Sequence, residues 1–220
     1  MHEILIEEKV LARNNELASA NRAALKSRGI FSINMVSSPG AGKTSLIEAL
    51  APFLKPRLNT LVIEGDLQTD LDSQRVLRSG IPAKQITTGK ACHLDAHAVG
   101  HALDWVFGNP GVRLLIIENV GNMVCPAEYD LGEDMMATIL STAEGDDKPL
   151  KYPAIFSASD ILVINKTDLA PFTDFDIKRA RANALKINPG LAIFETSCRT
   201  GAGIEALSDY LAKLSCAGRP

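Results

Sequence analysis

The stretch Ser37-Ser-Pro-Gly-Ala-Gly-Lys-Thr44 decides the fold of this chain. It follows an apolar run, residues 30–36, with the length and β-branched content of a buried strand, and it precedes residues 45–51, which have the pattern of an amphipathic helix. A strand, a glycine-rich loop and a helix in this order predict a P-loop, although Ser37 stands where the pattern G-x-x-x-x-G-K-S/T has its first glycine. The alternative is an ordinary turn between a strand and a helix.

Each part of such a loop has a physical role in binding phosphate. Gly40 and Gly42 let the backbone wrap closely around phosphate oxygens, so that successive N–H groups point inward at the start of a helix. Lys43 can reach the β- and γ-phosphates, and the hydroxyl of Thr44 can bind Mg²⁺. The predicted nucleotide-binding loop therefore comprises Ser38, Pro39, Gly40, Ala41, Gly42, Lys43, Thr44 and Ser45.

The composition bounds the remaining possibilities. With 220 residues, 46% of them apolar and 22% charged, the chain is expected to form one globular domain. A net charge of −3 does not favour a nucleic-acid or membrane partner, and no apolar run approaches the ~20 residues that span a bilayer. The acidic N-terminus does not resemble a signal peptide, so a cytoplasmic location and reduced cysteines are expected.

Strand and helix patterns alternate along the chain. Strands are expected at residues 60–63, 85–88, 113–117, 135–142, 161–164 and 192–195, helices at 3–27, 71–79, 95–105, 173–187 and 204–215, a polar loop at 144–151, and helix breaks at Pro52 and Pro56. This alternation predicts an α/β fold of the P-loop NTPase type, a mainly parallel sheet with helices on both faces, plus an N-terminal helix. Residues 1–29 would form a helical extension packed on the body or on a partner, and residues 30–220 a single P-loop domain.

The tetrapeptide Asn165-Lys-Thr-Asp168, which follows an apolar strand, points to the base of the nucleotide. The carboxylate of Asp168 can accept hydrogen bonds from N1 and N2 of guanine, whereas adenine would leave it poorly paired. Asn165 can bond the base edge and the stem of Lys166 can cover the purine, with Ser197 and Cys198 in a second base-contacting loop. GTP and GDP are therefore the predicted ligands of a GTPase domain. The alternative is a helix turn capped by Asp168.

Acidic residues at other strand ends are candidates for catalysis. Asp66 and Glu118 can bind Mg²⁺, together with Thr44, or orient the attacking water. The backbone N–H of Gly121 can meet the γ-phosphate. Asp70 and Asp72 lie in a predicted switch segment. Either could position the water, although Asp70 fits a solvated loop acid better. The predicted catalytic set comprises Lys43, Asp66, Asp72, Glu118 and Gly121.

A second group of residues suggests a transition-metal site. Cys92, His93 and Cys125 offer the thiolate and imidazole ligands that Zn²⁺ and Ni²⁺ accept, and His97 is a possible further ligand. His97 shares a helical face with His101. Taken singly, by local spacing alone, each of these residues fits an inert cysteine or a surface histidine better than a metal ligand. One chain offers few ligands for a closed site, and a site shared across a two-fold axis would supply more.

The chain resembles the HypB family, GTPases that assist nickel insertion during maturation of nickel–iron hydrogenases. The resemblance lies in residues 37–44, Ile63-Glu-Gly-Asp66, Thr88-Gly-Lys-Ala-Cys-His-Leu-Asp-Ala-His97, Ile117-Glu-Asn-Val-Gly-Asn-Met-Val-Cys-Pro126, Ser141-Thr-Ala-Glu-Gly-Asp-Asp147 and Val163-Ile-Asn-Lys-Thr-Asp168. It implies a homodimer with nucleotide at the interface and a Ni²⁺ or Zn²⁺ site there, formed by Cys92, His93 and Cys125. Because Cys125 follows Gly121 by only four residues, we also expect this metal site to be coupled to the nucleotide state.

The resemblance also implies an activity and partners. The activity is slow Mg²⁺-dependent GTP hydrolysis, and the partners are a HypA-type nickel chaperone and the hydrogenase large subunit. An accessory GTPase for urease or for a cobalamin enzyme is the nearest alternative, although the urease type carries Cys-Pro-His where this chain has separate Cys-His and Cys elements. A metal-binding scaffold that does not hydrolyse nucleotide is the alternative from a different class.

Overall fold

The computed structural model describes the chain except for residues 1, 69–70, 90 and 218–220. Across the described residues, seven strands form one parallel sheet in the order β3-β2-β4-β1-β5-β6-β7. The strand bounds are β1 Phe31–Ser37, β2 Thr60–Asp66, β3 Ala83–Thr87, β4 Leu114–Glu118, β5 Met135–Ser141, β6 Ile161–Asn165 and β7 Ala192–Glu195. Because all strands run the same way, their carboxyl ends meet at one edge of the sheet, where ligands of such folds bind.

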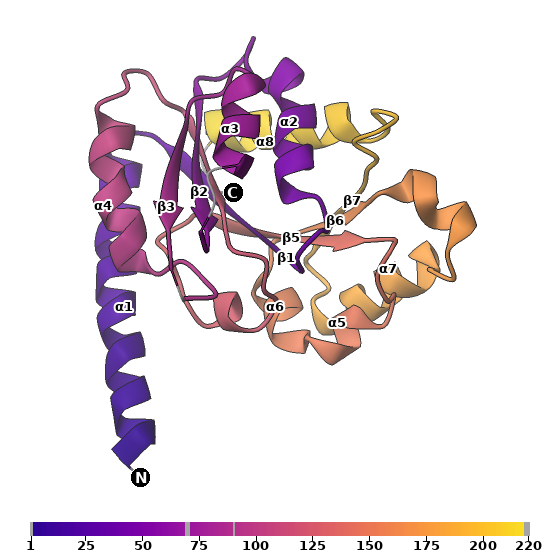
Figure 1. Ribbon diagram of the computed structural model, residues 1–220, viewed down its shortest axis with the longest axis horizontal. Helices are drawn as coiled ribbons and strands as arrows, with labels where there is room; N and C mark the ends of the chain where they lie inside the picture. Colours follow the sequence, from indigo (N-terminus) through magenta and orange to yellow (C-terminus); the bar gives the residue numbers. More distant parts are fainter. Residues whose placement is uncertain (1, 69–70, 90, 218–220) are drawn as a thin grey trace.

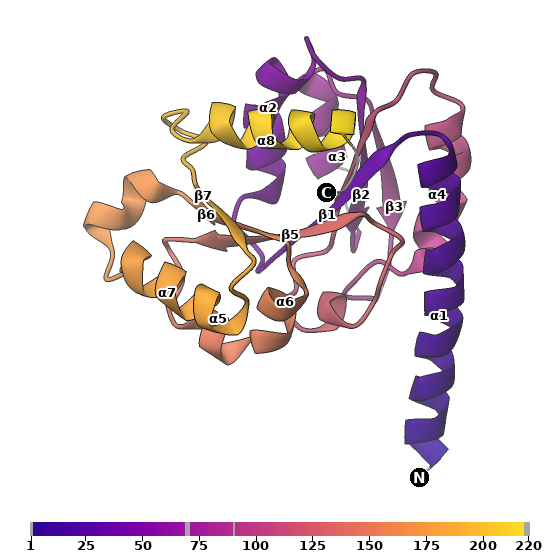
Figure 2. The ribbon, with the colours of Figure 1, turned by 180° about the vertical axis from the view of Figure 1, so that it is seen from behind.

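Helices cover both faces of this sheet, as predicted (Figures 1 and 2). Helices α2, α3 and α8 lie on one face, and α4, α6 and α7 on the other, with α1 packed beside α4. The helix bounds are α1 His2–Ser27, α2 Lys43–Leu54, α3 Leu71–Arg78, α4 Ala96–Phe107, α5 Lys148–Lys151, α6 Pro153–Ala158, α7 Ile177–Ile187 and α8 Ile204–Ala217, with 3-10 helices η1 Cys125–Ala127 and η2 Thr167–Phe172. No helix in the described ranges is long and apolar enough to cross a bilayer.

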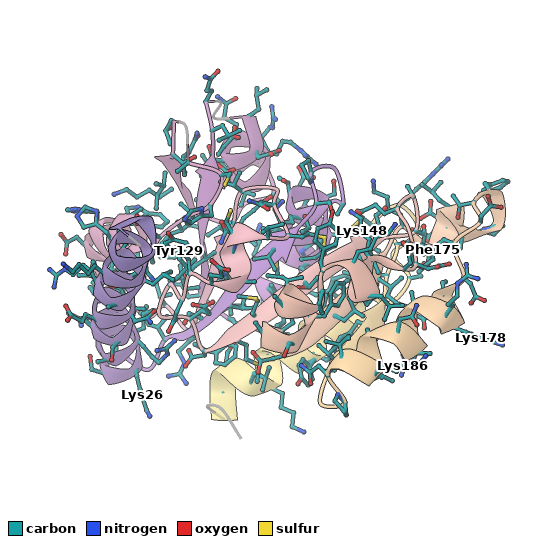
Figure 3. All side chains as sticks on the ribbon, turned by 90° about the horizontal axis from the view of Figure 1, so that it is seen from below. Lys26, Tyr129, Lys148, Phe175, Lys178 and Lys186 are labelled. Carbon is teal, nitrogen blue, oxygen red and sulfur yellow. The ribbon has the colours of Figure 1, made fainter. Side chains whose placement is uncertain are left out.

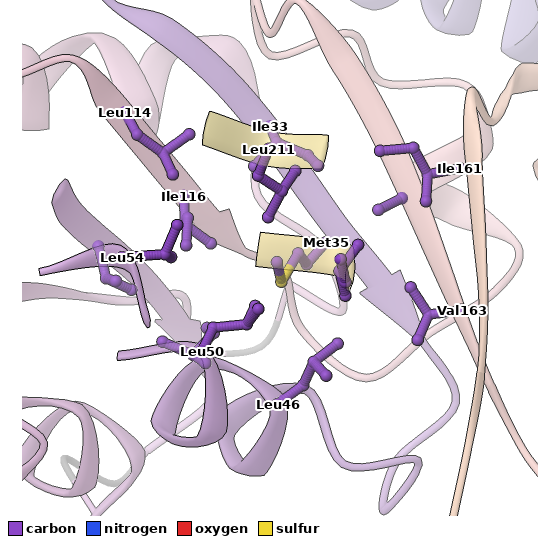
Figure 4. Close-up of a cluster of buried hydrophobic side chains, with 14 of the residues drawn as sticks. Ile33, Met35, Leu46, Leu50, Leu54, Leu114, Ile116, Ile161, Val163 and Leu211 are labelled. Carbon is purple, nitrogen blue, oxygen red and sulfur yellow. The ribbon is translucent and has the colours of Figure 1, made fainter. Parts of the chain in front are cut away.

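The core consists of alternating strand residues that pack against these helices. Ile33 and Met35 of β1 face Leu46 and Leu50 of α2 and Leu211 of α8 (Figure 4). The intervening strand residues point into separate apolar clusters on the opposite face. Every residue of β1, β4, β5 and β6 is buried because both faces are covered. The predicted α/β architecture is confirmed.

The second half of α1 is part of the body of the protein. Leu25 is buried, and the amide of Asn21 donates to the carbonyls of Ala96 and Leu131 over 2.8 and 3.0 Å. Asn14 accepts a hydrogen bond from the backbone N–H of Ala96 over 2.9 Å. The N-terminal turns of α1 project beyond the other elements (Figures 1 and 2). Helix α1 therefore holds the start of α4, and the division of the chain at residue 29 stays a prediction.

Three local predictions were wrong. Pro52 lies inside α2, which continues to Leu54 rather than ending at the proline. Residues 144–151 are not all loop, since α5 starts at Lys148 and the segment is held by buried Asp146, which accepts a hydrogen bond from Arg179 Nε over 2.8 Å. The helix expected at 173–187 starts only at Ile177, because Asp176 caps its first turn.

Candidate functional site

The phosphate loop lies between β1 and α2, at the carboxyl edge of the sheet. Gly42 has a φ of 101°, and a Cβ there would lie 2.7 Å from Asn165 Nδ2, so the position requires glycine. Lys43 Nζ donates to Ser37 Oγ over 3.1 Å. Ser37, the departure from the P-loop pattern, thus supplies a hydroxyl that orients the lysine. Burial lowers the pKa of Lys43, although the nearby Glu118 carboxylate opposes that shift.

Two buried carboxylates face this loop. Thr44 Oγ1 donates to Glu118 Oε1 over 2.8 Å, and Glu118 is the strand-register partner of Glu64. Burial raises the pKa of Glu64 to about 8, with repulsion from Glu118 and then Asp66 adding to it, and burial raises the pKa of Glu118 to about 7. In both glutamates, Oε2 is buried without a hydrogen-bond partner among the described residues. Such oxygens fit a divalent cation.

The other predicted acids lie at different depths in the site. Asp66 ends β2, and its Oδ1 accepts from the backbone N–H of Leu67 over 2.6 Å. Asp72 is in the first turn of α3 and is paired with Arg75 at 3.1 Å. Arg75 also donates to Ser45 Oγ over 2.9 Å and thereby ties α3 to the phosphate loop. Asp70 lies outside the described residues.

Gly121 packs directly against the phosphate loop. A Cβ at Gly121 would lie 2.9 Å from Pro39 Cα, so only glycine allows this approach. The next residue, Asn122, forms an antiparallel bridge with Ser37. The segment after β4 is therefore in register with the start of the loop, where a γ-phosphate sensor would lie.

A pocket of about 620 Å³ extends from Gly42 and Ser45 to the ends of β6 and β7. It is lined by Asn165, Lys166, Asp168, Cys198 and Arg199, among others. Asn165 Nδ2 donates to the carbonyl of Ala41 over 3.0 Å, and Lys166 Nζ to that of Gly40 over 2.6 Å. Ser197 Oγ donates to Asp168 Oδ1 over 2.6 Å. The two predicted base-binding segments thus meet beside the phosphate loop, in a space typical of small-ligand pockets.

Sequence reasoning missed several residues of this edge. Glu64 was assigned no role, although a carboxyl group directly after the apolar residues 61–63 of a buried strand is a visible signal. Lys148 bonds Ser38 Oγ and pairs with Glu144, which brings a second lysine to the loop (Figure 3). No sequence signal identified Lys148, because its segment has the composition of a polar loop.

Cys92, His93 and Cys125 form a second cluster, with their ligand atoms all within 4.8 Å of one another. Cys92 Sγ lies 3.3 Å from Cys125 Sγ and 3.7 Å from His93 Nδ1. The contact with Cys92 and burial raise the pKa of the Cys125 thiol, and burial lowers the pKa of His93, which favours the neutral imidazole that binds metals. Two thiols and an imidazole fit Ni²⁺ or Zn²⁺ with one position left open. His97 is not a member of this cluster.

Asn122 joins this cluster to the phosphate loop. Its Nδ2 donates to the carbonyl of Cys92 over 3.3 Å, and its Oδ1 accepts from the backbone N–H of Val124 over 2.8 Å. The same residue pairs with Ser37. One asparagine therefore contacts both cysteine-bearing segments and the first residue of the phosphate loop.

Comparisons with known proteins agree with this geometry. A family model described as "CobW/HypB/UreG, nucleotide-binding domain" matches residues 32–195. The hydrogenase maturation factor HypB of Rhizobium leguminosarum bv. viciae is 50% identical over 208 residues, covering 94% of this chain and 69% of that protein. The hydrogenase maturation factor HypB of Escherichia coli K12 is 43% identical over 213 residues, covering 96% of this chain and 73% of that protein.

A solved structure is similar as well. The crystal structure of HypB from Helicobacter pylori in complex with nickel matches with a TM-score of 0.88 and 37% sequence identity, covering 93% of this chain and 95% of that one. The fold and the sequence identity over most of the length agree. This chain therefore belongs to the CobW/HypB/UreG nucleotide-binding family and, within it, to the HypB hydrogenase maturation factors.

Proposed function

We propose that this protein is a GTP-hydrolysing metallochaperone that assists nickel insertion into a nickel–iron hydrogenase, with nickel as its cargo. Its relatives are named hydrogenase maturation factors, and one of them was crystallised with nickel. The cluster of Cys92, His93 and Cys125 offers soft sulfur and imidazole donors, which suit Ni²⁺ and Zn²⁺ and not Mg²⁺.

Guanine is the base that the pocket favours. Asp168 presents a carboxylate beside Lys166 and Ser197, and a carboxylate matches the two neighbouring donors of guanine. An adenine edge lacks this pair of donors and would leave the carboxylate poorly paired on the side that faces the base. The ligands of this pocket are therefore GTP and GDP, with their phosphates at residues 38–45.

Hydrolysis depends on charge placement at the phosphate loop. Lys43 is aimed into the loop by Ser37 and supplies positive charge where negative charge develops in the transition state. Thr44 and Glu118, already hydrogen-bonded to each other, would hold Mg²⁺ together with Asp66. Gly121 would offer its backbone N–H to the γ-phosphate. The Asp72 carboxylate, tied to Arg75, is one candidate for orienting water.

The observation that carries the proposal is the position of Asn122. Its backbone pairs with Ser37 of the phosphate loop, and its side chain bonds both segments that bear the cysteines. A movement of the segment from Gly121 on hydrolysis must therefore move the segments that bear Cys92 and Cys125, or break these bonds. Such a connection makes the affinity for the cargo metal depend on the nucleotide.

The cluster also favours an assembly. Three ligands per chain leave the coordination incomplete, and a second copy related by a two-fold axis would complete it. The proposed partners are therefore a second copy of the chain, a HypA-type nickel chaperone and the large subunit of the hydrogenase. No nucleic-acid or membrane partner is proposed for a chain of net charge −3.

The test is a Ni²⁺ titration of the chain loaded with GDP or with a non-hydrolysable GTP analogue, with dimer fraction recorded in parallel. Typical couplings predict affinities that differ by about 5–150-fold. Asn122→Ala should bring the ratio of the two affinities toward one. Asn109→Ala is the control and should preserve the ratio, because the Asn109 amide donates to the carbonyl of Trp105 in its own helix end. Equal affinities in both states, with no change in dimer fraction, would contradict the proposed coupling.

A further inference from the structure

We propose that Asn119 is a positioning residue of the cysteine cluster, an inference that rests on the proposed function of that cluster as the cargo-metal site. Asn119 directly follows Glu118 at the end of β4 and is only 1% exposed. Its Oδ1 accepts hydrogen bonds from the backbone N–H of Leu94 over 3.0 Å and from that of Val120 over 2.9 Å. Leu94 is the residue after His93, so one buried amide holds the segment that carries two of the three metal ligands.

The segment that bears Cys92 and His93 depends on side chains for its position. Both residues lie outside every strand and helix of the described chain, so no backbone ladder holds them. Asn122 donates to the carbonyl of Cys92, and Asn119 accepts from the N–H of Leu94. The backbone of His93 is therefore anchored on both sides by asparagine side chains.

Leu94 has little freedom to move away from this bond. Its side chain is fully buried in the apolar cluster that contains Ile63 and Ile117. A Cβ at Gly65 would lie 2.7 Å from Leu94 Cγ, so the leucine packs directly on the backbone of β2. A shift of the segment must then open the core or break the bond to Asn119, and both are costly for buried groups.

A chain of buried hydrogen bonds sets the orientation of the Asn119 amide. Its Nδ2 donates to Asn34 Oδ1 over 3.3 Å, and Asn34 Nδ2 donates to Glu133 Oε1 over 3.1 Å. Glu133 Oε2 accepts from the backbone N–H of Leu131 over 2.8 Å. Because each donor faces an acceptor, the carboxyl group at one end keeps the oxygen of Asn119 turned toward Leu94 at the other.

Neighbouring residues at the end of β4 thus hold the two sites. Glu118 accepts from Thr44 Oγ1 over 2.8 Å, on the side of the phosphate loop. Asn119 bonds the metal-binding segment, and its own backbone N–H donates to the carbonyl of Met35 over 3.0 Å, which fixes this junction to β1. We conclude that Asn119 sets the place of His93 relative to the nucleotide.

The test exchanges donors and acceptors along this chain of bonds in the full, GDP-loaded protein. Asn119→Asp keeps the acceptor for Leu94 but places a carboxylate oxygen against Asn34 Oδ1. Ni²⁺ affinity should fall about 10–100-fold, as on loss of other groups that orient metal ligands. GDP affinity should stay close to that of the original chain. Glu133→Gln alone should also weaken Ni²⁺ binding, because its single amide oxygen cannot accept from both Asn34 and Leu131.

The decisive variant combines the two substitutions. If the amide of Asn34 turns over, its Nδ2 can donate to the introduced carboxylate and its Oδ1 can accept from the introduced glutamine amide. Asn119→Asp with Glu133→Gln should therefore bind Ni²⁺ more tightly than either single variant. Asn183→Asp is the matched control, a buried asparagine of α7 that donates to the carbonyl of Asp146. It should lower the Tm without weakening Ni²⁺ binding.

A measurement on the unmodified chain does not require any variant to fold. The N–H of Leu94 should exchange slowly with solvent, although it lies outside the strands and helices, because it is buried and bonded. Fast exchange overturns the positioning role, as does a double variant that binds Ni²⁺ no better than the single ones. So does a Ni²⁺ affinity of Asn119→Asp within about twofold of the original. Ni²⁺ affinity that is equal in both nucleotide states contradicts the proposed coupling and leaves the positioning role standing.

Discussion

The nucleotide edge and the cysteine cluster are built in different ways. At the nucleotide edge, buried groups at strand ends bond buried groups at the start of α2: Lys43 donates to Ser37, and Thr44 donates to Glu118. In the cysteine cluster, Cys92 is exposed and Cys125 half-buried, in segments connected through Asn122. The first site is rigid before any ligand arrives, whereas the second has a geometry that a neighbour can change.

This difference matches two tasks. Rigid, pre-aligned charges lower the barrier of a phosphoryl transfer because they need no reorganisation during the reaction. A site that must both accept and release a metal gains from ligands whose separation can change. If this contrast is correct, substitutions at the nucleotide edge should act locally and strongly, and substitutions at the cluster should alter metal binding with little effect on the nucleotide.

The largest expected effect is that of Asp168→Asn on base choice. The carboxylate would lose two hydrogen bonds to guanine, each about 1.5–3 kcal/mol, so GDP affinity should fall about 10²–10⁴-fold. Xanthosine diphosphate should bind better than GDP, because the asparagine amide can donate to the oxygen that xanthine carries at C2. Competition titration with both nucleotides measures this.

The matched control is Asp174→Asn, an exposed acid in the segment that follows η2. It should bind GDP like the original chain. Wild-type protein that binds ADP as tightly as GDP would contradict the assignment of Asp168 to the base.

The way in which each site is built decides how much of it could be predicted from the sequence. The phosphate loop and residues 165–168 are contiguous motifs, so short stretches of sequence identified them, and the alternating pattern predicted the parallel sheet. Glu64 meets Glu118 only because β2 pairs with β4, a long-range register that no local pattern encodes. The position of Asn122 depends in the same way on its bridge to Ser37.

Lys43→Ala should have the next largest effect, on hydrolysis. Loss of one preorganised charge that stabilises a transition state typically costs about 10²–10³ in turnover. Phosphate release from GTP with Mg²⁺ measures this, and Lys186→Ala, on the exposed face of α7, is the control. Ni²⁺ affinity of the GDP-bound variant should stay close to that of the original. Full turnover in Lys43→Ala would exclude the proposed phosphate site.

Cys125→Ala tests the other region. Loss of one of two sulfur ligands should weaken Ni²⁺ binding by at least about 10–100-fold, while GDP affinity stays within about twofold. Titration with each ligand measures the two effects, and Cys216→Ala, an exposed cysteine in α8, is the control. An equal loss of GDP and Ni²⁺ binding would mean that the cluster is part of the structural support of the nucleotide edge.

The smallest expected effect is on the pH dependence of stability, where the two regions differ in sign. The pKa of Glu64 is raised to about 8 and that of Glu118 to about 7, so between pH 4.5 and 8 the folded chain binds more protons than the unfolded chain. The stability that these two carboxyl groups contribute to the folded chain is complete below pH 4.5. It is lost as the pH rises through 7 and 8. Burial lowers the pKa of His93. The stability that the neutral imidazole contributes is therefore lost as the pH falls below the ordinary pKa of histidine.

Thermal unfolding at pH 6.0 and 8.5 should therefore give a lower Tm at pH 8.5, with a shift on the order of 2–4 °C for each kcal/mol lost. Glu133, also buried with a pKa raised to about 7, adds to this fall, so the difference between variants isolates Glu64. Glu64→Gln should reduce the fall in Tm, because its amide carries no charge to bury. Glu205→Gln, on the exposed face of α8, should not reduce it. If the Tm falls as much in Glu64→Gln as in the original chain, proton binding by Glu64 does not contribute to the fall. The proposed difference in electrostatics between the two regions would then be wrong.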